Sequence, residues 1–332
     1  MAAITYENNF TTLAGWATGS LADQKRGYAY QSGNDFIHFF GRDSGHWVVS
    51  SGLTFWQKPQ ADETVEQWAQ KHFHATDCQQ LKNDAGEVVK GVWRPGLFDD
   101  SQMLQALQTS QIERRAAEQA LFSLVERLND LLLYIEPEGP GLAAYGPRSR
   151  ELLILACTEV ENTWTHYMRL ANQQPSGQGF KTTDYVKLAE PLHLKEFRVE
   201  LLPYAHAPRV APFAGWDAAA PTQSLPWYDA YNKTKHDRAA HLSDATFERC
   251  LEAVAANLVM FCVRFGPAAL FHQTTPLSSL VNHLFVVDLV DPDVTTFYVP
   301  RVEVPLDWDT TNIGWGDSQK WTVPWQQKPL AV

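Results

Sequence analysis

One apolar stretch, residues 247–263, constrains the fold of this chain more than any other part of the sequence. Its apolar residues recur every three to four positions, which is the period of an α-helix, and residues 258–263 are apolar on every side. Gly266 and Pro267 provide a stop signal, and we expect Ser243 to cap the start. A helix that is apolar all round must be buried, so the sequence predicts a helical domain around this segment.

Two earlier segments repeat apolar residues at the same period. The first runs from Ala117 to Ile135, and Pro137 ends it because proline cannot continue a helix. The second is expected to begin at Pro147 and carries Glu161 beside its apolar face. A half-buried carboxylate requires a partner, since leaving it unpaired costs several kcal/mol. The residues expected on the core face of this second helix are Leu153, Ala156, Val160, Trp164 and Tyr167.

The densest collection of reactive side chains lies in residues 227–238, shortly before the apolar helix. Ser224 is expected to cap a short helix here, with Pro226 in the first turn. The three-and-four spacing then places Tyr228, Asn232, Lys235 and His236 on one stripe, which could hold an anion. Lys235, His236 or Arg238 would supply the partner of Glu161. We therefore predict that the helices carrying Glu161 and His236 lie side by side.

The other parts of the chain have mainly β-type patterns. Residues 1–98 contain β-prone runs separated by turn residues, and one helix is expected at residues 62–73. Residues 172–222 form a long connection. The expected strands lie at residues 28–31, 36–40, 47–51, 88–93, 197–202, 284–290, 296–299 and 302–304. The sequence therefore predicts an α+β protein: a mixed α/β module (1–98), a central helical domain (99–270) and a β-rich extension (271–332), rich in Trp and Pro, that packs on the body.

Composition and charge narrow the class of protein. With 45% hydrophobic and 20% charged residues, the chain of 332 residues is typical of a globular rather than a disordered protein. A net charge of −11 argues against nonspecific coating of nucleic acid but permits one local basic pocket. The sequence starts without a secretory signal, and its longest apolar run is too short to cross a bilayer. We therefore expect a cytoplasmic protein without a membrane partner.

Candidate cofactor sites are few. His72, His74 and Cys78 are ligand types for zinc, but nothing nearby offers an obvious fourth ligand, and a structural role is the alternative. The polar stretch Arg42–His46 is interpreted as a hairpin connection. The sequence contains no Gly-rich phosphate loop, nucleophile elbow or dinucleotide fingerprint. We therefore predict neither a metal nor a cofactor.

Two motifs together carry a family resemblance. The stretch Ala156–Glu161, followed later by Tyr231–Arg238 and a buried, Ala-rich helix, resembles the helical core of HEPN-like proteins over residues 101–270. Many HEPN-like proteins are uncharacterised bacterial proteins, and some are ribonuclease toxins of phage-defence or toxin–antitoxin systems. Active members cleave RNA without a metal, usually across a dimer interface, by means of an arginine followed a few residues later by a histidine.

The resemblance assigns roles to several residues of this chain. His236 matches the histidine, and Asn232 stands upstream where the family has arginine, at a shorter spacing. Glu161 or Glu159 matches a polar residue that steadies the pair from an earlier helix. The resemblance also implies a homodimer with His236 near the interface.

Two functions follow from these residues. In the first, a metal-independent ribonuclease, His236 acts as general base or acid on the ribose 2′-hydroxyl of an RNA substrate in a local basic pocket. Lys235 and Arg238 then hold the phosphate, Asn232 donates a hydrogen bond to it, and Glu161 orients the histidine. In the second, the same residues form a structural ion-pair network in a non-catalytic module that binds a partner protein or supports assembly.

Overall fold

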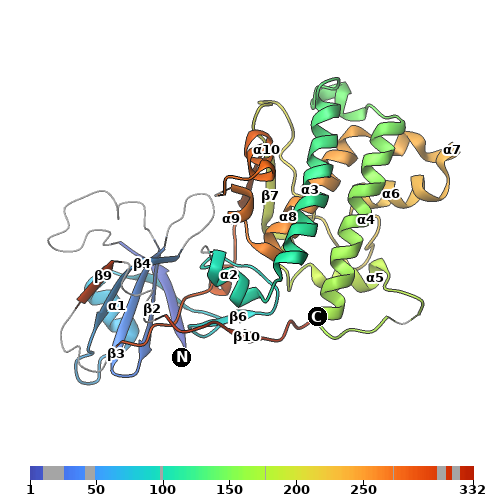
Figure 1. The fold of residues 1–332 in the computed structure, drawn as a ribbon. Coiled ribbons are helices and arrows are strands. Elements are labelled where there is room, and N and C mark those ends of the chain that lie inside the picture. Colours follow the sequence, from blue (N-terminus) through green and yellow to red (C-terminus); the bar gives the residue numbers. More distant parts are fainter. Residues whose placement is uncertain are drawn as a thin grey trace. The chain divides into compact units, whose positions relative to one another are not determined.

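The computed structural model describes residues 1–9, 26–41, 49–97, 100–175, 177–271, 273–304, 312–315 and 322–332. The chain divides into two compact units. Unit 1 comprises Met1–Gln108 and Pro292–Lys328, and unit 2 comprises Thr109–Asp291 and Pro329–Val332. Both units contain helices and strands (Figure 1), which confirms the α+β class. The stretch 271–332, expected as one extension, is divided between the two units.

Some features expected from the sequence lie outside the described residues. They are the turn Arg42–His46 and the tail residues Trp308 and Trp321.

Unit 1 contains a six-stranded antiparallel sheet with the strand order β5-β1-β2-β3-β4-β9. Successive side chains of a strand point to opposite faces, and the buried residues of β3 follow this rule. Ile37 and Phe39 enter one core cluster, whereas Phe36 and Phe40 enter another. The strands are β1 (Ala3–Glu7), β2 (Arg26–Ser32), β3 (Asp35–Gly41), β4 (Val49–Gln57), β5 (Thr76–Gln80) and β9 (Asn312–Trp315). The aromatic residues Tyr28, Tyr30, Phe36, Phe39 and Phe40 of β2 and β3 are therefore core residues.

Helix α1 (Val65–Phe73) packs on the cluster that contains Phe36 and Phe40. It begins with a capping box: the Thr64 hydroxyl accepts from the Gln67 N–H at 3.2 Å, and the Gln67 side chain accepts from the Thr64 N–H at 2.9 Å. Trp68, Ala69 and Phe73 are buried on its inner face. The helix expected at residues 62–73 is thus confirmed, with a start three residues later.

Residues 292–304 return to unit 1 and complete its other core cluster. Phe297, Val299 and Val302 are buried there with Tyr30, whose hydroxyl donates to the Pro300 carbonyl at 2.9 Å. The other elements of unit 1 are α2 (Asp100–Leu107), β6 (Glu87–Val89), η5 (Val294–Thr296) and β10 (Gln326–Lys328), and β6 pairs with β10 in parallel.

The strands expected at residues 296–299 and 302–304 are not formed. The Tyr298 N–H donates to the Pro95 carbonyl at 2.8 Å, and the Val299 carbonyl accepts from the Gly86 N–H at 2.8 Å. Val302 makes a single isolated bridge to Thr322. This backbone therefore bonds to turns of unit 1 and not to a neighbouring strand, which a β-prone composition alone could not distinguish.

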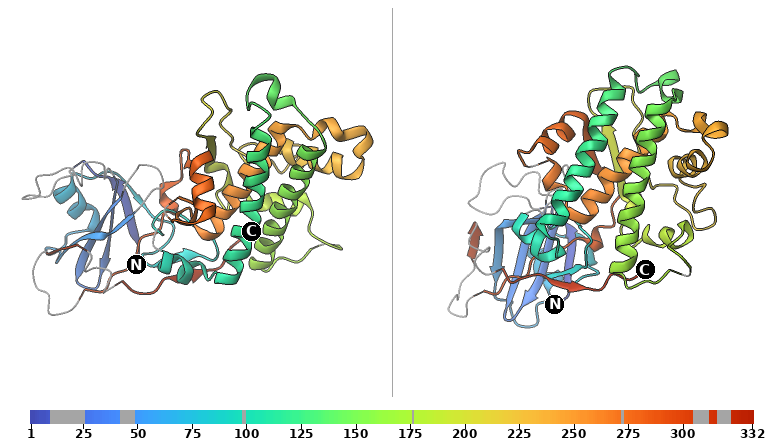
Figure 2. Two further views of the ribbon diagram at one scale, coloured as in Figure 1. Left: turned by 45° about the horizontal axis from the view of Figure 1, so that its top comes forward. Right: turned by 45° about the vertical axis from the view of Figure 1, so that its right-hand side comes forward.

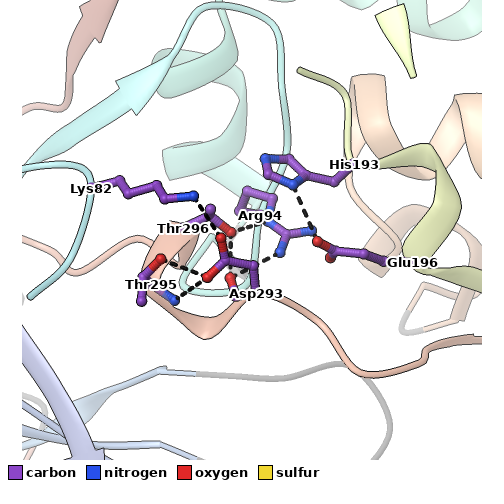
Figure 3. Close-up of polar contacts among 7 residues, drawn as sticks. All are labelled: Lys82, Arg94, His193, Glu196, Asp293, Thr295 and Thr296. Carbon is purple, nitrogen blue, oxygen red and sulfur yellow. Dashed lines mark hydrogen bonds and ion pairs between the residues drawn. The ribbon is translucent and has the colours of Figure 1, made fainter. Parts of the chain in front are cut away.

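Polar contacts fix the start of this returning segment (Figure 3). The Asp293 carboxylate accepts from Lys82 Nζ at 2.7 Å and from the Thr295 N–H at 3.1 Å. Arg94 is buried, and its Nε donates to Thr296 Oγ1 at 2.9 Å. Two cations from residues 82–94 therefore hold the segment in place.

The imidazole of His38 is fully buried in unit 1. It stacks on Phe73 with ring centroids 3.7 Å apart, and it contacts the edge of Phe40. Neither ring nitrogen has a hydrogen-bond partner among the described residues. Burial therefore lowers the pKa of His38 well below its ordinary value of 6.5.

Acid is expected to destabilise unit 1 through this histidine. Below pH 6.5 the unfolded chain binds a proton at His38 that the folded chain does not bind. The free energy of unfolding should therefore decrease as the pH is lowered below 6.5, and this group contributes up to about 1.4 kcal/mol per pH unit. His38→Phe should remove that slope in amide-exchange measurements on β3, and the exposed His206→Phe should not. An unchanged slope in His38→Phe would contradict the assignment.

Four helices form the core of unit 2: α3 (Gln111–Leu132), α4 (Pro147–Leu170), α6 (Pro226–His236) and α8 (Phe247–Phe265). Helix α8 contacts the other three, and α4 also contacts α3 and α6. Nearly every residue of α8 is buried, as the apolar sequence predicts. Figures 1 and 2 show α3 and α4 side by side. The remaining helices are η1 (Gly139–Ala143), α5 (Thr182–Tyr185), η2 (Val186–Leu188), η3 (Leu194–Glu196), α7 (Arg238–His241), η4 (Leu242–Asp244), α9 (Ala268–Phe271) and α10 (Pro276–Leu284).

Two strands complete unit 2. β7 (Phe197–Leu201) and β8 (Phe285–Leu289) pair antiparallel, which confirms the strands expected at residues 197–202 and 284–290. In the turn before β7, His193 Nδ1 lies 3.2 Å from Glu196 Oε1 (Figure 3).

The starts of α6 and α8 differ from the predictions. Leu225 is the N-cap of α6, because the Ser224 hydroxyl accepts from the Asp217 N–H at 3.0 Å in the preceding loop. Thr246 caps α8 by accepting from the Arg249 N–H at 3.3 Å. Ser243, the expected cap, lies in η4 instead.

Candidate functional site

Glu161 lies between α4 and α6 and accepts hydrogen bonds from two tyrosines of α6. The Tyr228 hydroxyl donates to Oε1 of the carboxylate, and the Tyr231 hydroxyl donates to Oε2 at 3.0 Å. The two helices therefore lie side by side, as predicted. The prediction that a cation pairs directly with Glu161 is wrong: among the described residues its carboxylate forms no ion pair, and its hydrogen-bond donors are the phenols of Tyr228 and Tyr231.

Lys235 extends this arrangement by one helical turn. Its Nζ donates to the Tyr231 hydroxyl at 2.7 Å and lies 4.8 Å from the centroid of the Tyr231 ring. This hydrogen bond raises the pKa of Lys235, so the side chain stays charged. Burial raises the pKa values of Tyr228 and Tyr231, which keeps both phenols neutral donors. The four residues Glu161, Tyr228, Tyr231 and Lys235 are called the Glu161 network below.

A second polar contact joins the same two helices. Arg150, near the start of α4, donates from Nη2 to the Thr234 carbonyl at 3.0 Å and from Nε to the Thr234 hydroxyl at 3.2 Å. Thr234 is buried in the last turn of α6, where helix carbonyls lack intrahelical partners. Arg150 therefore caps the carboxyl end of α6 and fixes where the chain leaves the helix.

An aromatic cluster around Trp164 packs against Tyr228 of the Glu161 network. Trp164, one turn after Glu161 on α4, is fully buried and stacks on Trp216 with ring centroids 4.7 Å apart. It also contacts Tyr228 and Tyr185, with centroids 5.3 Å away in each case. The connection between α4 and α6 is thereby anchored on α4, which limits the positions that Tyr228 can take.

The residues assigned to RNA chemistry fall into two groups. The Asn232 side chain donates from Nδ2 to the Tyr228 carbonyl at 2.9 Å, so its amide bonds to the backbone of its own helix, α6. Lys235, His236 and Arg238 are exposed. Among the described residues, the side chains of His236 and Arg238 take part in no hydrogen bond or ion pair, and Glu161 does not bond to His236.

Tyr231 and Arg150 were not identified as site residues from the sequence. Tyr231 lies three residues after Tyr228, and this spacing predicts that the two phenols share one face of the helix. Arg150 carries no comparable signal, because its partner is a backbone carbonyl at the end of another helix.

The described part of the chain does not assemble a metal site. No three His, Cys, Asp or Glu residues within it converge to hold an ion, so His72, His74 and Cys78 do not form the zinc set considered above.

Among the helices that the structure describes, none has both the length and the hydropathy needed to cross a bilayer.

Removal of the Tyr228 hydroxyl is expected to destabilise unit 2 by about 1 to 3 kcal/mol, because it leaves one carboxylate oxygen of Glu161 without its donor. Tyr228→Phe tests this in urea unfolding, and the exposed Tyr134→Phe on the same unit is the control. In a Glu161→Gln background the Tyr228→Phe change should cost less, since the charged acceptor is gone. Equal costs in both backgrounds would show that the hydroxyl does not act through Glu161.

Comparisons with known proteins leave the site to be interpreted from its own chemistry. No protein-family model matches the chain, and neither the curated proteins nor the solved structures yield a match.

Proposed function

We propose that unit 2 is a HEPN-like, RNA-binding domain in which the segment Lys235–Arg238 contacts RNA phosphates. The observation that carries the proposal is the exposure of two cations and an imidazole within these four residues. The Glu161 carboxylate accepts hydrogen bonds from two phenols, and among the described residues no ion pair joins it to His236 or Arg238. Exposed Lys and Arg side chains are the usual partners of RNA phosphates.

The helical arrangement supports the HEPN-like part of the proposal. Four helices contact one another around α8, and the segment 235–238 begins at the end of the short helix α6. Asp237 accepts from the Ala240 N–H at 3.1 Å, so its carboxylate is engaged in capping α7. The charged groups that remain available on this segment are therefore predominantly basic.

Arg238→Ala is expected to weaken binding of a short single-stranded RNA and to reduce its salt dependence. Each phosphate contact contributes about 0.7 to the slope of log affinity against log salt for single strands, so the slope should fall by about that amount. Fluorescence anisotropy at several salt concentrations measures it. Arg115→Ala, which removes an exposed arginine from α3, should leave the slope unchanged. An equal loss in both variants would mean that binding follows total charge and not this segment.

Metal-independent RNA cleavage is a second candidate function. The observation that favours it is the exposed imidazole of His236, two residues from Arg238, because imidazole transfers protons near neutral pH. His236→Ala should then abolish RNA turnover in the presence of a metal chelator while RNA affinity changes little. Equal turnover by wild type and variant, or none by either, excludes this activity. If RNA does not bind at all, a non-catalytic assembly module for a partner protein or a second copy becomes the better explanation.

A further inference from the structure

A polar cavity of about 570 Å³ lies on another side of α6 from the Glu161 network. Asp229 and Lys233 of α6 line one wall, Asp244 of η4 lines the next, and Glu248 and Arg249 of α8 line a third. Residues of η1 also line the cavity. The volume lies within the range of small-molecule sites, which is roughly 300–1,000 Å³.

The cavity is close to the segment Lys235–Arg238 along the chain. The last α6 residue that lines it is Lys233, two residues before that segment, and its η4 wall begins at Ser243, shortly after α7. The base pocket proposed below requires that a nucleotide whose phosphate lies on residues 235–238 reach this cavity with its base. Sequence-specific proteins commonly read single-stranded RNA by taking an unstacked base into such a pocket.

The charged groups of the cavity combine acceptors with donors. Lys233 Nζ lies 2.7 Å from one carboxylate oxygen of Asp229, and Arg249 lies 3.4 Å from Glu248 through Nη2. A carboxylate offers about four acceptor positions, so each retains capacity for a ligand. The side chains of Asp229, Asp244 and Glu248 are 21%, 38% and 39% exposed, which leaves them accessible.

We propose that this cavity receives one base of the bound RNA and selects guanine. Guanine presents two adjacent donors, N1–H and the N2 amino group, which match the two oxygens of one carboxylate. It also presents two adjacent acceptors, O6 and N7, which suit a cation such as Lys233 or Arg249. Uracil has one ring donor between two carbonyls, and adenine and cytosine each offer a single amino group without a neighbouring N–H. The inference rests on the proposed RNA binding.

Short RNAs that differ at a single position test the proposal. An oligomer with one guanosine in an otherwise adenosine background should bind about tenfold more tightly than the all-adenosine oligomer, as expected for one bidentate contact. Inosine at that position, which lacks the N2 amino group, should lose part of this advantage. Asp229→Asn, Asp244→Asn and Glu248→Gln are measured in turn, and at least one should abolish the preference. Asp130→Asn, which lines a different groove on α3, is the matched control.

The outcomes separate this inference from the proposed function. Arg238→Ala should weaken all the oligomers by a similar factor and leave the guanosine preference intact. Tight binding of every oligomer without a preference would overturn the base pocket and leave the RNA-binding proposal standing. A preference that survives all three carboxylate substitutions would also overturn it. Failure to bind any oligomer would overturn the RNA-binding proposal and the pocket with it.

Discussion

Gly96→Ala is expected to destabilise unit 1 by about 3 kcal/mol or more. Gly96 has φ +108, a conformation that side-chain-bearing residues rarely adopt. A Cβ atom there would lie 1.9 Å from the carbonyl oxygen of Tyr298. That oxygen belongs to backbone held by the Tyr298 N–H to Pro95 hydrogen bond of 2.8 Å, so it cannot move away without breaking the contact.

Amide exchange in β2 and β3 reports the stability of unit 1 and can measure this effect. Gly33→Ala provides a matched control, because Gly33 also has a positive φ, +60, but a Cβ atom there meets nothing within 4 Å. The control should cost only about 1 to 2 kcal/mol, the price of the left-handed conformation alone. Similar losses in both variants would show that residues 292–304 do not pack against Gly96 as described.

Trp164→Ala is expected to destabilise unit 2 by about 3 to 5 kcal/mol, as for other large aromatic residues removed from a core. Trp164 is fully buried and contacts Trp216 and Tyr228, with ring centroids 4.7 Å and 5.3 Å away. Its loss leaves a cavity beneath the Glu161 network. Exchange should therefore rise first in α6, because Tyr228 loses the ring that positions it.

Urea unfolding gives the magnitude, and residue-resolved exchange gives the location. Leu155→Ala on the same helix is the control: the Leu155 side chain is 39% exposed, and its loss should cost less than about 1 kcal/mol. If Trp164→Ala lowers stability but leaves exchange in α6 unchanged, the aromatic cluster does not support the site.

The four core helices of unit 2 were predictable because each one satisfies a local rule. Pro147 marks the start of α4, and the 3.6-residue period of its apolar residues identified its core face correctly. α8 was predictable from an apolar composition on all sides. Helix α10 was not predicted, although Thr275 and Pro276 are a cap and a first-turn proline.

The long-range contacts were only partly predictable. A β-prone run between turn residues predicted β3, but nothing local indicates that residues 292–304 bond to the turns at Gly86 and Pro95. The same limit applies to the site. The sequence predicted that Glu161 lies beside α6. Whether phenols or cations become its partners depends on the rotation of α6, which tertiary packing sets.

Amide exchange of the protein with and without a short single-stranded RNA shows whether the segment Lys235–Arg238 contacts RNA. We expect RNA to slow exchange in residues 232–244, which include this segment and α7, while exchange in α3 stays the same. Protection confined to α3 or to unit 1, with residues 232–244 unchanged, would contradict it.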